Sequence, residues 1–144
     1  MKSKLITMNA KKMIIAGLLG GVAYFFLGWL VWGILLMDII TYPEDMVQVI
    51  LIPEEEMRIS FMIISCLAYG LFMAYIFNKW ASISTFKTGA QAGAMIGAAF
   101  SIIVGTSMHS MYTFTSIPNI AFDTLANLVT SAIVGGIVGW YLGR

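Results

Sequence analysis

Four long stretches of this sequence carry no charged side chain, and they limit how the chain can fold. They cover residues 13–37, 59–77, 88–122 and 124–143. A helix needs roughly 20 apolar residues to cross about 30 Å of hydrocarbon, because each residue advances the helix by about 1.5 Å. The sequence therefore predicts an all-α fold, a transmembrane four-helix bundle, as one integral membrane domain over residues 1–144 with spans at about 13–37, 59–77, 88–109 and 120–143.

Composition agrees with a chain that lies almost wholly in or beside a lipid bilayer. Hydrophobic residues make up 60% of the sequence and charged residues 10%, whereas soluble domains have about 45–50% apolar and about 25% charged residues. The single cysteine, Cys66, lies inside the second stretch and can form no intramolecular disulfide. No nucleophile with an adjacent base and no glycine-rich phosphate loop is recognisable, so we expect neither an enzyme nor a cofactor, and no nucleic-acid partner.

The charges are sorted between the connections. All seven acidic residues lie in the gap after the first stretch or the gap after the third, and seven of the eight basic residues lie before the first stretch, between the second and third, or after the fourth; Arg58 is the exception. Lysine and arginine are retained in the cytoplasm during insertion. We therefore expect a multi-pass protein of the cell inner (plasma) membrane with both termini cytoplasmic.

The connection after the first span, residues 38–58, contains its own helix signals. Pro43 followed by Glu44 and Asp45 is typical of a helix start, because proline suits the first turn and carboxylates favour the positive end of the helix dipole. The apolar residues that follow are too few to span, so we expect a short amphipathic interfacial helix there. Residues 53–56, a proline and three glutamates, predict that the second span begins with carboxylates at its N-terminus.

Small residues recur every fourth position in the last two spans, which places them on one face of each helix. A face without side chains lets another backbone approach closely. These residues predict tight helix contacts, either within the chain or with another copy: Gly89, Gly93, Gly97, Ser101 and Gly105 in the third span, and Gly135, Gly139 and Gly143 in the fourth.

The face that carries the last three glycines also carries polar residues toward the other end of the fourth span: Asp123, Asn127 and Ser131. A carboxylate facing lipid is costly, so these groups should face protein or water. By span length His109 should lie at the depth of Asp123, which predicts a polar cluster of His109, Asp123 and Asn127. Gln91 would extend a polar path only if it faced Asn127 and Ser131. The alternative is that His109 and Asp123 are wetted interfacial residues.

Methionine suggests one further reading. Met108, His109 and Met111 lie together, and thioether and imidazole groups suit soft metals such as Cu(I). No methionine array accompanies them, and methionine is a common filler of packing gaps. We therefore expect no metal site.

The sequence shows two resemblances, one between two of its own spans and one to a known family. Residues 16–24 of the first span match residues 92–100 of the third in their pattern of small and aromatic residues, as a duplicated helix pair would. The segments GVAYFFLGWLVWGILLMD, FNKWASISTFKTGAQAGAMIG and SAIVGGIVGWYLG together resemble an uncharacterised family of small four-span bacterial membrane proteins. That resemblance implies a bacterial inner membrane and no particular activity.

The sequence leaves three functions open. The first is a non-enzymatic membrane protein that assembles with itself, as a homo-oligomer, or with a larger membrane partner through its glycine faces. The second is a small oligomeric transporter or channel for a proton, ion or small solute, along a path formed by His109, Gln91 and the polar face of the fourth span. The third is soft-metal binding by Met108, His109 and Met111.

Overall fold

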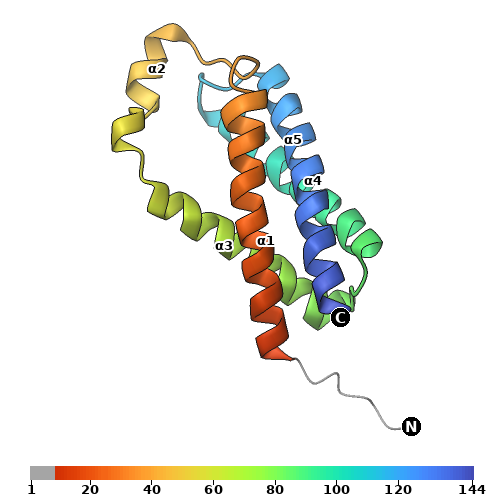
Figure 1. Cartoon of the computed structure of the whole chain (residues 1–144). Coiled ribbons are helices and arrows are strands. Elements are labelled where there is room, and N and C mark those ends of the chain that lie inside the picture. Colours follow the sequence, from red (N-terminus) through yellow and green to blue (C-terminus); the bar gives the residue numbers. More distant parts are fainter. Residues whose placement is uncertain (1–8) are drawn as a thin grey trace, which may run out of the picture.

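The computed structural model describes residues 9–144, and within them the chain is all-helical, as predicted. Four long apolar helices form the bundle, so the protein is a multi-pass membrane protein (Figure 1). Shorter helical segments lie between or extend them. In chain order the elements are α1 (Ala10–Leu30), η1 (Val31–Leu35), α2 (Glu44–Ile50), η2 (Glu54–Glu56), α3 (Ile59–Ile76), η3 (Phe77–Ala81), α4 (Phe86–Met111) and α5 (Ile117–Leu142).

Side-chain caps fix three of the long helices at their N-termini. Asn9, Thr85 and Ser116 each accept a hydrogen bond from the backbone N–H three residues on, at 3.1, 3.1 and 3.3 Å. Such caps satisfy N–H groups that have no partner inside the helix. At their C-terminal ends α1 and α3 each continue into a π-helical turn, η1 and η3 respectively.

Figure 1 shows α1 starting and α5 ending at one end of the bundle, which we call the terminal end; the opposite end, which carries α2, is the α2 end. The short helix expected after the first span is α2, which begins at Glu44 after Pro43, as the sequence indicates; its place at the membrane interface stays a prediction. The predicted acidic start of the second span is wrong. Residues 54–56 form the separate turn η2, and α3 begins only at Ile59, with no acidic residue in its first turn.

The α1 and α3 helices form one closely packed pair. A Cβ atom added to Gly17 would lie 2.7 Å from Cα of Leu71, and one added to Gly21 would lie 2.7 Å from Cα of Leu67. Gly70 of α3 faces the backbone of Gly17 and Gly21 in return. The contact is therefore backbone against backbone, and it lies toward the terminal end.

The α4 and α5 helices form a second pair of the same kind. A Cβ atom on Gly93 would overlap the carbonyl oxygen of Ser131, and one on Gly89 would overlap that of Gly135. Gly139 and Gly143 face the carbonyls of Thr85 and Ser84, just before α4. The small-residue faces of the last two spans thus contact each other within one chain. Gly93 and Gly97 of α4 thus contact a neighbouring backbone in the same way as Gly17 and Gly21 of α1, the glycines whose spacing they match in the sequence.

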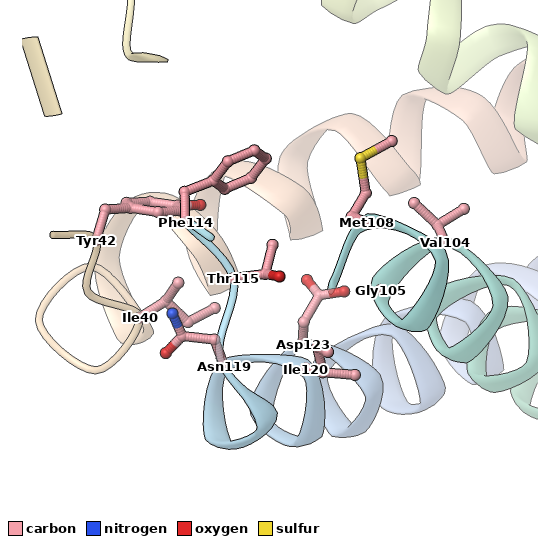
Figure 2. Close-up of a pocket in the computed structure, with 10 residues that line it drawn as sticks. All are labelled: Ile40, Tyr42, Val104, Gly105, Met108, Phe114, Thr115, Asn119, Ile120 and Asp123. Atoms are coloured by element: carbon pink, nitrogen blue, oxygen red, sulfur yellow. The ribbon is translucent and has the colours of Figure 1, made fainter. Parts of the chain in front are cut away.

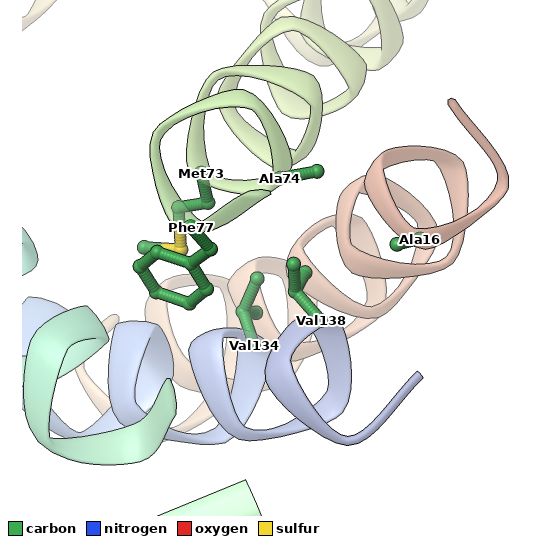
Figure 3. Close-up of a cluster of buried hydrophobic side chains, with 6 residues drawn as sticks. All are labelled: Ala16, Met73, Ala74, Phe77, Val134 and Val138. Carbon is green, nitrogen blue, oxygen red and sulfur yellow. The ribbon is translucent and has the colours of Figure 1, made fainter. Parts of the chain in front are cut away.

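The two pairs meet in a hydrophobic core near the terminal end (Figure 3). Its fully buried members come from α1, α3 with η3, and α5: Ala16, Met73, Ala74, Phe77, Val134 and Val138. Val134 and Val138 pack against the bare backbone of Gly20. The terminal half of the bundle is consequently filled by apolar side chains.

Candidate functional site

Asp123 is an ionisable residue inside a membrane span. It lies six residues into α5, which is about 9 Å along the helix axis at about 1.5 Å per residue. Its carboxylate accepts hydrogen bonds from Trp32 Nε1 at 2.7 Å, Ser101 Oγ at 2.6 Å and Asn127 Nδ2 at 3.0 Å. These donors come from η1, α4 and α5 itself, so three spans converge on one carboxylate.

All three donors are neutral groups. They satisfy the acceptor-only oxygens of a carboxylate without neutralising its charge. No lysine or arginine lies in residues 13–57 or 88–143 of the sequence, which include α1, α4 and α5 beyond their first turns. Ionisable residues within membrane spans are expensive and commonly mark a path or binding site for an ion or substrate.

A chain of polar contacts continues from Asp123 toward the middle of the bundle. Asn127 Oδ1 accepts a hydrogen bond from the Tyr24 hydroxyl at 3.1 Å. The Tyr24 ring packs against the Tyr69 ring, with centroids 4.6 Å apart. The hydroxyls of Tyr69 and Ser131 are 2.8 Å apart. We call this set the polar cluster: Tyr24, Trp32, Tyr69, Ser101, Asp123, Asn127 and Ser131.

The polar cluster bridges the two helix pairs. Tyr24 and Trp32 belong to the α1 span and Tyr69 to α3, whereas their partners Asn127, Asp123 and Ser131 all lie on α5. Each pair is held internally by backbone contacts between glycines. Three side-chain hydrogen bonds of the site therefore join two units that are themselves tightly packed.

Three cavities meet at Asp123. The largest, about 580 Å³, lies between the α1 span, the start of α3, and Asp123 with Asn127 of α5. A second, about 220 Å³, separates Tyr24 and Tyr69 from α4. The third, about 250 Å³, opens at the α2 end; Figure 2 shows Asp123 and Asn119 rising from α5 on one side of it and Tyr42 and Phe114 on the other.

The cavities do not continue into the terminal half. From Ser131 toward the terminal end, the next buried residues on the same side of α5 include Val134 and Val138. Both belong to the hydrophobic core (Figure 3). Asp123 is thus accessible from the α2 end and from the side of the bundle, while the apolar core closes the opposite half.

Of the residues singled out by the sequence, Asp123, Asn127 and Ser131 belong to the polar cluster. The structure does not bring His109 to them: its Nδ1 lies 3.0 Å from the carbonyl oxygen of Thr115. The residue of α4 level with Asp123 is Ser101, and His109 lies eight residues further, about 12 Å along the helix.

Gln91 also lies outside the polar cluster. It is exposed on α4, two positions from both Gly89 and Gly93, which are buried against α5. Residues two apart on a helix point to different sides, so Gln91 faces away from Asn127 and Ser131. The residues considered as soft-metal ligands lie in different surroundings. Met108 lines the cavity of Figure 2, whereas Met111 is 75% exposed.

Sequence reasoning did not predict Tyr24, Trp32 and Tyr69 as site residues. It predicted Ser101 as a helix-packing residue but not as a hydrogen-bond donor to Asp123. One signal was present. Tyrosine hydroxyls and indole N–H groups inside a span need hydrogen-bond partners, and the carboxylate and amide of the fourth span can supply them.

Comparison with protein families, with curated proteins and with solved structures found no match.

Proposed function

We propose that the protein is a small membrane transport protein in which Asp123 binds a transported proton or cationic solute. The observation that carries the proposal is the position of Asp123: a carboxylate with only neutral donors, inside a span, where three cavities meet. A carboxylate with a purely structural role would cost less free energy at the membrane–water interface than inside a span.

The arrangement of the helices supports a carrier rather than an open pore. The polar cluster joins the α1–α3 pair to the α4–α5 pair, and the hydrophobic core closes the terminal half. Carriers built from repeated halves bind substrate between the halves and expose the site by rocking one half against the other. That motion would require breaking the hydrogen bonds that join the pairs in the polar cluster and rearranging the side chains of the hydrophobic core.

The competing hypothesis, assembly through glycine faces, receives less support. Those faces of α4 and α5 contact each other, so they are not free to bind another copy. A homo-oligomer or a larger membrane partner would have to use other faces of the bundle, and this stays a prediction.

The orientation follows from the charges. We place the basic terminal end in the cytoplasm of a bacterial inner membrane and the acidic α2 end outside. Cysteines introduced as Asp45→Cys or Lys87→Cys in a Cys66→Ser background test this with a membrane-impermeant maleimide on intact cells. Labelling at position 45 and protection at position 87 is the expected result; the reverse pattern contradicts it.

Flux through reconstituted liposomes tests the function. The tracers are protons, read with an internal pH-sensitive dye, rubidium and tetraethylammonium, each driven by an imposed gradient. We expect uptake of at least one tracer above that of empty liposomes, abolished by Asp123→Asn and preserved by Asp38→Asn, which removes an exposed carboxylate at the same end. Absence of flux for all three, or equal flux with Asp123→Asn, would overturn the proposal.

A further inference from the structure

The largest cavity has a lining that points to a particular class of solute. Its volume, about 580 Å³, falls within the range of about 300–1,000 Å³ that is usual for small-molecule sites. Four aromatic side chains of the α1 span line it, Tyr24, Phe25, Trp29 and Trp32, together with residues near the start of α3 and with Asp123 and Asn127 of α5.

Aromatic faces and one carboxylate are the groups that recognise organic cations. A ring carries negative charge density on its face, and tryptophan attracts cations most strongly of the three aromatic residues. Quaternary ammonium groups are held in this way because they cannot donate a hydrogen bond. Asp123 supplies the only full negative charge of this lining, and its bonds to Trp32 and Asn127 fix its position.

The same lining is poorly suited to an inorganic cation. Hard cations require several oxygen ligands around them. Here the side-chain oxygens are few, and those of Asp123 and Asn127 already accept hydrogen bonds from other side chains of the protein. An organic cation fills the apolar volume that a metal ion would leave empty.

The position of the opening fits a solute that partitions into membranes. The helices α1 and α3 touch at Gly17, Gly21 and Gly70, but Gly28 and Gly33 of the α1 span meet only its own tryptophans. The two helices therefore separate toward the α2 end, as Figure 1 shows. Trp29 and Met62 line the cavity and are 63% and 43% exposed, so the cavity reaches the outer surface of the bundle within the length of the spans.

Charge at the α2 end would concentrate cations there. The connection from residue 38 to residue 58 contains six acidic residues and one basic residue, Arg58. A surface of one predominant sign raises the local concentration of opposite charges.

We infer that this cavity binds lipophilic organic cations, such as quaternary ammonium or phosphonium compounds, with the cationic centre beside the Trp32 ring and the Asp123 carboxylate that it holds. The inference rests on the proposed function, for which it names the substrate class, but it is tested by binding and needs no flux. The site would receive its ligand from the bilayer between α1 and α3 and release it when the helix pairs rearrange.

Tryptophan fluorescence gives a direct test, because two of the four tryptophans line the cavity and the other two, Trp80 and Trp140, lie near the terminal end. A Trp80→Phe/Trp140→Phe variant in detergent or nanodiscs is titrated with tetraphenylphosphonium. We expect saturable quenching, weakened roughly tenfold or more by Asp123→Asn, as expected from loss of a charge partner in a low-dielectric site. Asp38→Asn in the same background should weaken the affinity far less than Asp123→Asn, because Asp38 does not line the cavity and is one of six acidic residues of the connection.

Two controls separate site binding from partition into lipid. Tetraphenylborate has the same shape and the opposite charge, and it should not quench saturably. A Trp29→Phe/Trp32→Phe variant, which keeps the two remote tryptophans, should report no saturable quenching by tetraphenylphosphonium. Equal binding of both ions, no saturable quenching, or an affinity unchanged by Asp123→Asn would overturn the inference.

The outcomes also distinguish this inference from the proposed function. Asp123-dependent flux of protons or rubidium without phosphonium binding would overturn the inference and leave the function standing. Asp123-dependent phosphonium binding without flux of any tracer would do the opposite.

Discussion

Trp32 donates a 2.7 Å hydrogen bond from its indole Nε1 to Oδ1 of Asp123, joining the last turn of the α1 span to the first third of α5. Trp32 lies in η1, where the backbone widens to a π-helical turn and Leu36 N donates to the carbonyl of Val31 at 2.8 Å. Single π-turns recur at functional sites because they change the direction in which side chains project. Here the turn includes the one side chain that ties the α1 span to the carboxylate.

Trp32→Phe should lower the stability of the bundle. The substitution keeps an aromatic ring but removes a donor to Asp123, and interhelical hydrogen bonds in membranes contribute about 1–2 kcal/mol. We expect a loss of this size in the free energy of unfolding, measured by SDS titration in mixed micelles. Trp29→Phe is the matched control, one turn away and 63% exposed, and should have little effect. Equal losses for both would show that the hydrogen bond contributes nothing.

Gly93→Ala should destabilise the α4–α5 pair. A Cβ atom there overlaps the backbone of Ser131, so the helices must move apart, which costs about 1–3 kcal/mol for overpacking. Gly28→Ala adds the same methyl group on α1, where the nearest atom, of Trp32, is 3.9 Å away. That control should be neutral or stabilise by up to about 1 kcal/mol, because alanine favours the helix. Gly93→Ala with wild-type stability would contradict the backbone contact.

Tyr69→Phe and Ser131→Ala should be non-additive. Their hydroxyls form the hydrogen bond that joins α3 to α5, so removing either group already breaks it. A double-mutant cycle should give a coupling energy between about 0.6 kcal/mol, the average for such bonds in membranes, and about 1.7 kcal/mol, the maximum. Pairing Tyr69→Phe with Thr106→Ala provides the control, since Thr106 bonds only carbonyls of its own helix. The stability losses of Tyr69→Phe and Thr106→Ala should add within about 0.5 kcal/mol. No larger deviation from additivity for Tyr69→Phe with Ser131→Ala would refute the hydrogen bond between α3 and α5.

Cys66 should report occupation of the largest cavity. It is the single cysteine of the chain, it lines that cavity, and it is 7% exposed. Tetraphenylphosphonium at about ten times its dissociation constant should slow reaction with a small methanethiosulfonate by about tenfold, if reagent and ligand compete for the space. Asp123→Asn should remove the protection at the same concentration.

The control for this labelling places the thiol elsewhere. Ser110→Cys in a Cys66→Ser background puts it at an exposed position that does not line the cavity. Its labelling rate should not respond to the cation. A similar slowing at both positions would indicate an effect on the membrane instead.

The spans were predictable because hydrocarbon excludes charge, and the predicted spans begin and end within a few residues of the apolar helices. The glycine faces were predictable as contacts but not as partners, since a bare face accepts any backbone. His109 was expected beside Asp123 because both seemed to end their spans. However, α4 continues to Met111 and α5 begins at Ile117, so the end of α4 extends beyond the carboxylate. The need of Tyr24 and Trp32 for polar partners was visible in the sequence, but their partners could not be assigned, because nothing in the pattern of α1 indicates which face meets α5.

The two helix pairs differ in the length of chain that joins their members. Residues 112–116 connect α4 to α5, whereas residues 36–58 separate the α1 span from α3. Loop-closure entropy grows with the logarithm of loop length, which makes the first pair costlier to bring together by roughly 1 kcal/mol. The half of the protein that is synthesised last is thus the easier to assemble, and during biogenesis it can serve as the platform on which the earlier half docks.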